Sequence, residues 1–371
     1  MNFAFSEEQE ELRKAVRRFM EDKSPVTEVR RLMETAKGYD AAVWRQLAEQ
    51  LGLTGLAIPE AYGGSGFSAV EQSIVFEEMG RALYCGPYFA TVALAANVLL
   101  SSGDDDAKAA YLPGIAAGET IATLAVTEED GGWGVDSFAS SATAAGAGYT
   151  LNGIKSYVID GQNASLLLVA ATAAGGVSLF AVEAGAPGLS VEEIPTLDQT
   201  RKMARVTLSN TPGRLVGAEG GGASILTVTM DLAAVALAAE EVGGAARCLE
   251  MSVDYAKSRI QFGRAIGSFQ AIKHKCADVL LEVESAKSAA YYAGWVASQD
   301  SEELAVAAPL AKAFCSDAYF LAAAENIQIH GGIGFTWEHD AHLYFKRAKA
   351  SQLLFGDSTY HRAKLADRVG I

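Results

Sequence analysis

The spacing of apolar and polar residues indicates helices in the first third of the chain. The segment SEEQEELRKAVRRFMED begins at Ser6 with an N-cap residue, acidic residues in the first turn and apolar residues at helical intervals. Helical spacing continues through AAVWRQLAEQLG and SAVEQSIVFEEMGRAL, with the turn-rich stretch IPEAYGGSG between them. We therefore expect an N-terminal helical domain over residues 1–117.

The pattern changes to that of strands between residues 118 and 222. The short β-branched runs YTLNGIKSYVIDG, ASLLLVAAT, GVSLFAVEA and ARVTLSNTP are separated by Gly, Asn and Pro. Helical spacing then returns in four long segments, roughly 223–257, 268–299, 302–331 and 339–350. The chain thus predicts an α+β multidomain protein, with a middle β domain over 118–222 and a C-terminal helical bundle over 223–371.

Composition and charge narrow the classes of function. Half of the 371 residues are apolar, which suffices for a sizeable core, and the formal net charge is −15. This charge excludes a nucleic-acid partner, because such binding depends on clustered Lys and Arg. The N-terminal MNFAFSEEQEEL is acidic where a signal peptide would be basic, and no apolar run approaches the roughly 18 residues of a membrane span. We expect no membrane association.

The cysteines indicate a reducing compartment. Cys85, Cys248, Cys276 and Cys315 lie far apart and have no C-x-x-C spacing. This arrangement favours buried reduced thiols over a disulfide framework or a zinc site. We expect no bound metal and a cytoplasmic location.

Five motifs occur in a specific order along the chain: IPEAYGGSG (58–66), VTEEDGGWG (126–134), LNGIKSYVIDG (151–161), RIQFGRAIGSFQAIKH (259–274) and QIHGGIGFTWE (328–338). Together they resemble the acyl-CoA dehydrogenase family over essentially the whole chain, and most of all its bacterial members that form unequal heterotetramers. The resemblance implies a β-barrel-like middle domain between an N-terminal helical domain and a C-terminal four-helix bundle. It also implies a homo- or heterotetramer that binds FAD at a subunit interface.

The motif RIQFG and the residues after it supply one set of cofactor positions. In similar family members, the positions of Arg259, Phe262 and Gln270 grip the FAD of the neighbouring subunit. The chemistry agrees, because a guanidinium offers a planar five-donor fork that suits a pyrophosphate. The alternative is a surface arginine followed by a turn between helices.

The motif QIHGGIGF supplies a second set. Its glycines are expected where a helix ends, which leaves backbone amides open to a flat or anionic group. Gln328, Gly331 and Gly332 match family positions that contact the adenylate part of FAD. The alternative is a plain C-capping loop, and we expect His330 to be a locally hydrogen-bonded residue and not a general base.

Two residues of the β domain match the family's flavin-ring contacts. Thr127 would contact the ring from a strand, and Tyr157 would stack on it from the opposite side. Both are also compatible with ordinary strand positions. The family loop commonly reads T-E-P-x-A-G-S-D, and this chain departs from it with Glu129, Asp130 and Trp133.

The family's catalytic glutamate is absent from both of its usual positions. Dehydrogenation of an acyl-CoA thioester needs a carboxylate to take the α-proton, hydrogen bonds to the thioester carbonyl and a flavin to accept the β-hydride. The common family position lies twenty residues after Phe335, at Phe355. The minority position lies ten residues before Gly243, at Ala233, and the next position, often arginine in the family, is Ala234.

Two acidic residues near Ala233, Glu240 and Glu241, are weaker candidates for the base, and Asp357 is a candidate for cofactor binding. Glu240 and Glu241 lie on the same predicted helix as Ala233, where an apolar environment could raise a carboxyl pKa and create a base. Alternatively, either forms a cap or a salt bridge to another helix or subunit. Asp357 matches a family position that contacts the flavin nucleotide, or it simply forms a turn after Gly356.

These residues leave three interpretations open. The first is a subunit that binds FAD but lacks the catalytic glutamate, paired with a homologous dehydrogenase subunit that supplies it. Such pairs resemble the heterotetramers of bacterial steroid side-chain breakdown, which accept bulky ring-bearing CoA thioesters. The second is an active homo-oligomer whose base is Glu240 or Glu241. Both imply an acyl-CoA thioester substrate and an electron-transfer flavoprotein or similar acceptor. The third is a flavin-free acyl-CoA or protein-binding scaffold.

Overall fold

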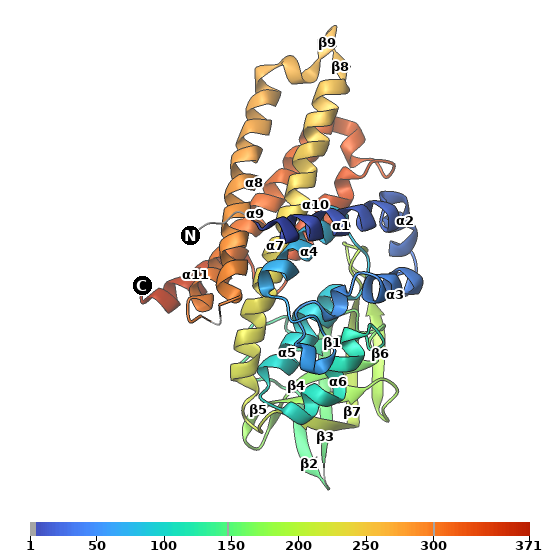
Figure 1. Ribbon diagram of the computed structural model, residues 1–371, viewed down its shortest axis with the longest axis vertical. Coiled ribbons are helices and arrows are strands. Elements are labelled where there is room, and N and C mark those ends of the chain that lie inside the picture. Colours follow the sequence, from blue (N-terminus) through green and yellow to red (C-terminus); the bar gives the residue numbers. More distant parts are fainter. Residues whose placement is uncertain (1–4, 147, 300) are drawn as a thin grey trace. The chain divides into compact units, whose positions relative to one another are not determined.

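The computed structural model describes residues 5–146, 148–299 and 301–371 (Figure 1). Its helices are α1 (Glu7–Lys23), α2 (Val26–Met33), α3 (Ala41–Glu49), α4 (Ala69–Arg81), α5 (Asn97–Ser101), α6 (Asp105–Ala116), α7 (Gly222–Ser258), α8 (Gln270–Ala297), α9 (Leu304–His330), α10 (Ala341–Leu353) and α11 (Ser358–Val369). Its strands are β1 (Ala122–Ala125), β2 (Ser141–Ala145), β3 (Gly148–Ile159), β4 (Leu166–Ala173), β5 (Gly176–Glu183), β6 (Leu189–Ile194), β7 (Met203–Val216), β8 (Ile260–Gln261) and β9 (Arg264–Ala265). A π-helix, η3 (Phe89–Ala96), precedes α5.

The chain packs as two compact units. One contains the described residues up to Arg30, together with Ala69–Tyr84 and Ala234–Ile371, and we call it the bundle unit. The other contains Arg31–Ser68 and Cys85–Ala233, and we call it the β unit. The helices α1 and α4, which come from the N-terminal segment, therefore pack with the C-terminal helices. The domain boundaries at 117 and 222 stay predictions.

The bundle unit is built around α9, which contacts α8, α10 and α11, while α4 contacts α1 and α8. Small side chains dominate its core, including Ala290, Ala293, Ala308 and Ala311, all of them fully buried. Such side chains let neighbouring helices approach closely. The four predicted C-terminal helices are confirmed, and α11 lies outside the predicted segments. The N-cap predicted at Ser6 is present, with a capping box to Gln9 at the start of α1.

Two glycines allow α4 and α7 to touch through their backbones. A Cβ added to Gly80 would lie 1.9 Å from the carbonyl oxygen of Glu240, and one added to Gly243 would lie 1.8 Å from that of Glu77. No side chain fits at either position. The crossing therefore fixes the register of α7 against α4.

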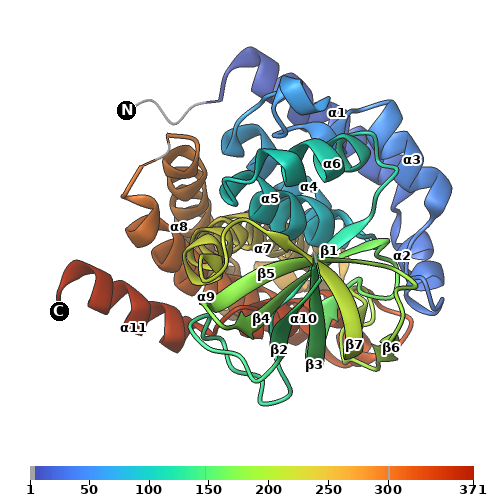
Figure 2. The same cartoon turned by 90° about the horizontal axis from the view of Figure 1, so that it is seen from below.

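The β unit contains a barrel-like sheet. The strand order is β1-β4-β2-β3-β7-β5, and an additional pairing of β4 with β5 closes the ring (Figure 2). Its interior is filled by apolar side chains such as Leu151, Leu167, Val169 and Phe180. The four predicted strands correspond to β3, β4, β5 and β7, and the barrel-like architecture is confirmed.

Two helical segments are long and apolar enough to cross a membrane by length and composition alone. They are Gly222–Ser258 and Leu304–Phe335, whose most apolar windows are 67% and 56% buried. The expectation that no segment approaches this length is thus wrong. Buried core helices pass the same test, so this finding is weak evidence for a membrane span, and the absence of membrane association stays a prediction.

The four cysteines are free thiols, as expected. Cys85, Cys248 and Cys315 are buried, and Cys276 is partly buried. The cytoplasmic location inferred from them stays a prediction.

Candidate functional site

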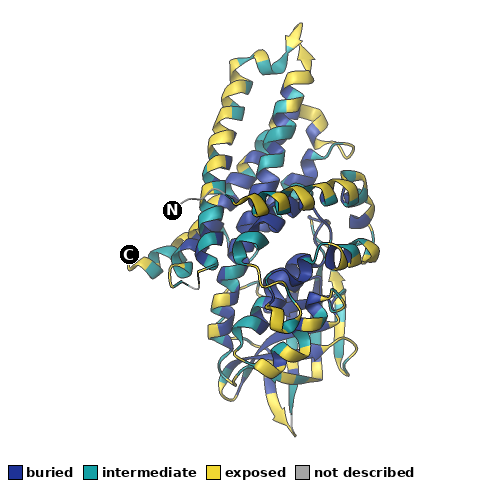
Figure 3. Cartoon of the chain, viewed as in Figure 1, coloured by how far each residue is buried: buried dark blue, intermediate teal, exposed yellow. Residues whose placement is uncertain are grey.

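The motif RIQFGRA forms a hairpin between α7 and α8, at one end of the bundle unit (Figure 1). Strands β8 and β9 pair, and the two turn residues, Phe262 and Gly263, have φ values of 52° and 77°. This is the conformation that two-residue hairpin turns prefer. It holds the ring of Phe262 92% exposed, and Figure 3 shows this end of the bundle as exposed.

Arg259 and Gln270 flank the hairpin. Arg259 follows the last residue of α7, Gln270 is the first residue of α8, and both are exposed. Within the described part of the chain, neither side chain makes a hydrogen bond or an ion pair. The guanidinium of Arg259 therefore keeps all of its donors for a bound group.

The loop at the end of α9 is also open. α9 ends at His330, Gly331 has a φ of 64°, and a short 3-10 turn follows over Gly331–Phe335. A Cβ added to Gly331 or Gly332 would meet no atom within 4 Å. The predicted helix end is confirmed, and Gln328 is exposed beside it.

His330 is a packing residue. Its Nδ1 lies 2.7 Å from the carbonyl oxygen of Asn326, and its ring stacks on Tyr255 with the centroids 4.3 Å apart. Burial lowers the pKa of His330 below its ordinary value. The expectation of a local hydrogen-bonded role is confirmed.

Arg30 anchors the segment that follows this loop. Its guanidinium donates to the carbonyl oxygens of Trp337 and His339 at 2.8 and 2.9 Å, and to the carboxylate of Asp340 at 2.9 Å. These three acceptors lie just after Gly331–Phe335. No local sequence pattern indicates this contact, because Arg30 is more than 300 residues away.

The turn at Phe355 joins α10 to α11. Phe355 has a φ of 61° and Gly356 a φ of 115°. The carbonyl oxygen of Phe355 lies 3.2 Å from His361 Nε2, and the carboxylate of Asp357 caps α11 by accepting from the Tyr360 amide at 2.8 Å. Asp357 thus forms the turn as its alternative interpretation expected, and its contact with a flavin nucleotide stays a prediction.

Glu240 and Glu241 are both engaged by cations on other helices. The carboxylate of Glu240 accepts from Arg347 at 2.8 Å, and that of Glu241 accepts from Ser316 at 2.9 Å and lies 3.5 Å from Lys312. Burial raises the pKa of Glu241 above its ordinary value. The interhelical ion pairs match the non-catalytic alternative. The usual glutamate positions hold Phe355 and the buried Ala233, which is followed by the buried Ala234.

Thr127 and Tyr157 come together in the β unit. The amide of Ser156 donates to the carbonyl oxygen of Thr127 at 2.9 Å, so the two segments lie side by side. Tyr157 is 48% exposed and has a φ of 56°. It lies in a bulge of β3, between Lys155 and Val158, where the pairing with β7 shifts by one residue.

Backbone strain marks several predicted positions. Six non-glycine residues in the described ranges have positive φ: Leu83, Tyr157, Asp160, Asn210, Phe262 and Phe355. Three of them, Tyr157, Phe262 and Phe355, are positions to which the family resemblance assigns a role in cofactor binding or catalysis. Each such conformation costs about 1–2 kcal/mol, and such strain concentrates at functional sites.

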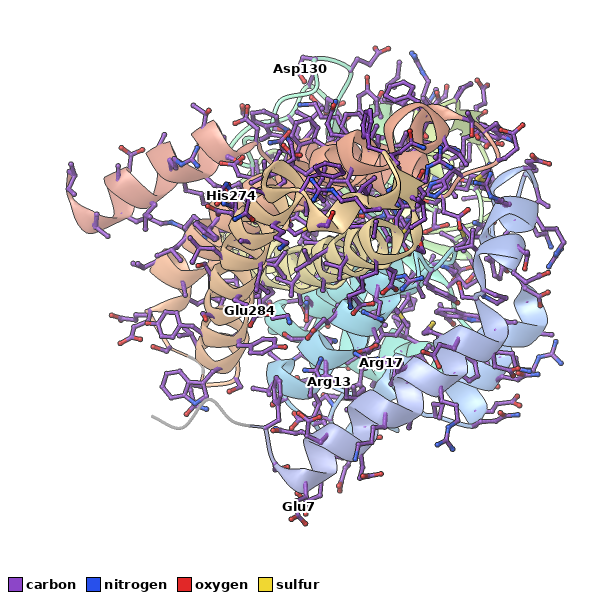
Figure 4. All side chains as sticks on the ribbon, turned by 90° about the horizontal axis from the view of Figure 1, so that it is seen from above. Glu7, Arg13, Arg17, Asp130, His274 and Glu284 are labelled. Carbon is purple, nitrogen blue, oxygen red and sulfur yellow. The ribbon has the colours of Figure 1, made fainter. Side chains whose placement is uncertain are left out.

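A cavity of about 250 Å³ lies elsewhere in the bundle unit. Its lining includes Arg17, Glu78, Arg81, Arg247 and Tyr344, and none of the predicted site residues. Two of its arginines are paired with carboxylates: Arg17 donates to Glu78 at 2.7 Å, and Arg81 pairs with Glu250. Figure 4 labels Arg17 on α1. We assign no ligand to this cavity.

Comparisons with known proteins cover nearly the whole chain. The family models described as the N-terminal, middle and C-terminal domains of acyl-CoA dehydrogenase match residues 6–119, 123–211 and 220–370. The acyl-CoA dehydrogenase IpdE2 of Mycolicibacterium smegmatis is 36% identical over 351 residues, which is 95% of either chain.

Solved structures agree with this match. A variant of the steroid ACAD Tcur3481-Tcur3483 has a TM-score of 0.89 at 32% identity and covers 98% of both chains. The ChsE4-ChsE5 complex of Mycobacterium tuberculosis has a TM-score of 0.91 at 28% identity, covering 100% of this chain and 99% of the other.

Proposed function

Because the chain belongs to the acyl-CoA dehydrogenase family of FAD-dependent enzymes, we propose that it is the subunit of an unequal pair that lacks its own catalytic glutamate. The partner is a homologous dehydrogenase subunit. It supplies the carboxylate that takes the α-proton of an acyl-CoA thioester.

The observation that carries this proposal is the turn at Phe355. The turn has a left-handed backbone, a glycine at Gly356 and a capping aspartate at Asp357, and an apolar ring stands where the family's base would be. Ala233 leaves the second possible position without an acid as well. A hydrocarbon side chain cannot accept the α-proton, so the base has to come from elsewhere.

The residues of this chain fit FAD. Arg259 offers an unengaged fork for the pyrophosphate, and the open backbone at Gly331 and Gly332 admits the adenylate group. The exposed ring of Tyr157, beside Thr127, offers a face for the flavin ring. When bound, FAD supplies the acceptor for the β-hydride. These assignments remain predictions for the individual residues.

Two of the similar structures support the unequal pair. The steroid ACAD Tcur3481-Tcur3483 carries two designations in its name, and the ChsE4-ChsE5 complex contains two differently named proteins. We infer a bulky, ring-bearing acyl group for this chain by the same comparison. We further propose a tetrameric assembly, a cytoplasmic location and an electron-transfer flavoprotein or similar acceptor.

Co-expression tests the proposal. The chain is purified alone and together with a homologous dehydrogenase subunit that carries the catalytic glutamate, and both preparations are compared by visible absorption, by mass in solution and by dye-coupled turnover of a panel of CoA thioesters. We expect flavin, a larger mass and turnover only after co-expression. A chain that turns over CoA thioesters when purified alone contradicts the proposal.

The second candidate is an active homo-oligomer with an unusual base. The one observation in its favour is the raised pKa of the buried Glu241, which burial causes. The ion pairs of Glu240 with Arg347 and of Glu241 with Lys312 oppose it. Glu240→Gln and Glu241→Gln in an active preparation decide the matter, because unchanged turnover in both excludes either as the base. The flavin-free scaffold is not supported, since the family is FAD-dependent.

A further inference from the structure

The β unit contains a fully buried lysine ammonium that the reaction itself does not require. Lys155 of β3 is 0% exposed. Its Nζ donates to the carbonyl oxygen of Val126 at 3.2 Å and to the carboxylate of Glu128 at 2.9 Å, and it lies 3.9 Å from the centroid of the Phe138 ring. A buried ammonium is retained only where it is well paired.

The partner carboxylate extends this contact to a third segment. Glu128 accepts from the backbone amides of Ala139 and Ser140 at 2.7 and 2.8 Å. One ion pair therefore joins β3, the strand exit at 126–128 and the segment 138–140. It closes the base of the intervening loop, which carries Trp133.

Thr127 lies in the middle of these contacts. Lys155 holds the residue before it through the Val126 carbonyl and the residue after it through the Glu128 carboxylate. The carbonyl oxygen of Thr127 itself accepts from the Ser156 amide. Contacts at Val126, Thr127 and Glu128 thus hold the backbone at Thr127 and on both sides of it.

Tyr157 is placed by the same stretch of β3. In a regular strand, residues 155 and 157 would point to the same face of the sheet. The bulge and the positive φ of Tyr157 change this, so that Lys155 is buried while Tyr157 is 48% exposed. The ammonium anchors the inner side of the bulge, and the aromatic ring stands on its outer side.

We propose that Lys155 is a positioning residue for the flavin ring, because its ammonium fixes Thr127 on one segment and the bulge that presents Tyr157 on the other. This inference rests on the proposed assignment of Thr127 and Tyr157 to the flavin ring. Burial lowers the pKa of Lys155 to about 8 and the contact with Glu128 opposes this shift, so the side chain is an ammonium below that pH.

The test uses the flavin-containing preparation, alone or co-expressed, with three variants. Lys155→Met removes the ammonium, and Glu128→Gln removes the partner charge while leaving Lys155 in place. Lys202→Met is the matched control, since Lys202 also donates to a carboxylate, Glu193 at 2.8 Å, and to a backbone carbonyl, Met33 at 3.1 Å, in the same unit. The readouts are FAD affinity, the position of the visible flavin absorption band and the melting temperature.

We expect Lys155→Met to weaken FAD binding by about tenfold to a hundredfold, the range for lost hydrogen bonds to a charged group, and to shift the absorption band. Glu128→Gln should show a smaller change in the same direction, and Lys202→Met should leave both flavin readouts unchanged. A purely structural role for Lys155 would lower the melting temperature without moving the absorption band.

Unchanged FAD affinity and band position in both Lys155→Met and Glu128→Gln would overturn the proposal. If Lys155→Met does not fold, Glu128→Gln alone decides by the same criteria. A parallel variant, Tyr157→Leu, checks the premise: no change there means that the ring assignment has failed, and the proposal with it. The co-expression test of the unequal pair is independent of these results.

Discussion

Phe355, Tyr157 and Phe262 hold left-handed backbones, each at a cost of about 1–2 kcal/mol that glycine would not bear. Such conformations persist where the surrounding contacts over-determine them. At Phe355 those contacts are the His361 bond to its carbonyl, the Asp357 cap and the close approach of Tyr360 to Gly356. Tyr157 and Phe262 lie in the motifs and Phe355 was located by its spacing from Phe335, but a sequence does not display φ, so the strain was visible only in the structure.

Phe355→Glu tests whether the turn can still present a base. A glutamate bears the same left-handed cost as phenylalanine, so we expect an unchanged fold and an unchanged flavin content. If the pocket of this chain admits a thioester, the variant gains dehydrogenation activity, measured with a dye acceptor and a panel of CoA thioesters. Phe355→Gln is the control, because it has the same shape without the carboxylate and should gain nothing. Equal activity in both variants would show that the carboxylate is not the cause.

Phe262→Gly separates stability from cofactor binding. The ring is 92% exposed, so its loss removes little burial. Relief of the left-handed strain is offset by the greater freedom of glycine in the unfolded chain, about 0.4–1 kcal/mol. We expect the free energy of unfolding in urea to stay the same or rise by up to about 1.6 kcal/mol, while flavin is retained less well. Full flavin retention would exclude Phe262 from the cofactor site.

Among the elements, the crossing of α4 and α7 depends on two glycines that face backbone carbonyls. Gly243→Ala places a methyl group 1.8 Å from the carbonyl oxygen of Glu77, and such overpacking costs about 1–3 kcal/mol. We expect the urea midpoint of the bundle unit to fall accordingly. Gly332→Ala is the control within the same unit, because no atom lies within 4 Å of a Cβ there. A similar loss in both variants would show that the contact with α4 is not responsible.

The ion pair between Lys155 and Glu128 predicts that the stability of the protein depends on pH. Burial opposes ionisation of Glu128, but hydrogen bonds from Ser140, from the Lys155 ammonium and from the Ala139 amide outweigh it and lower the pKa to about 2. Since the ordinary value is 4.5, the folded state is favoured above pH 4.5, and this contribution disappears as the pH falls to about 2. Melting temperatures of Glu128→Gln should therefore vary less than those of wild type between these pH values. Parallel curves would contradict this assignment.

The sequence predicted the long elements better than the short ones. The helices α7 to α9 have sustained periodicity, and β3, β4, β5 and β7 are rich in β-branched residues. By contrast β1 reads ATLA and β2 reads SATAA, alanine-rich segments whose strand conformation comes from pairing with β4 and β3. Alanine has no intrinsic preference for strands, so β1 and β2 are strands because they pair with neighbouring strands.

For the molecule as a whole, the motif order was sufficient to predict the family, the cofactor and the fold class. The division of the chain into its two units was not predictable from the sequence. The helix α1 contacts α4 through the ion pairs of Arg13 with Glu77 at 2.8 Å and of Arg17 with Glu78 at 2.7 Å. The paired residues are about sixty positions apart in the sequence. Figure 4 labels both arginines on α1. Charged residues on one face of a helix usually indicate a solvent-exposed surface, so the local sequence does not indicate that they form ion pairs with another helix.

Two exposed aromatic side chains on the bundle unit predict which segments become protected from amide hydrogen exchange on assembly. Phe262 is 92% and Phe335 74% exposed, on the two segments expected to contact FAD and a neighbouring subunit. We expect amide hydrogen exchange at 260–265 and 331–337 to be fast in the chain alone and slow in the flavin-containing complex. The turn between β4 and β5 serves as the reference and should exchange equally in both. Fast exchange in both preparations would show that these segments remain free after assembly.

The aromatic side chain of Phe355 also makes the turn a place for a spectroscopic reporter. A nitrile-bearing phenylalanine at this position keeps the ring and the backbone conformation that His361 and Asp357 hold. Its stretching frequency responds to the local electric field, so it would record whether a carboxylate of the partner subunit or a bound thioester approaches. The residue that replaced the base can in this way report where the working base lies.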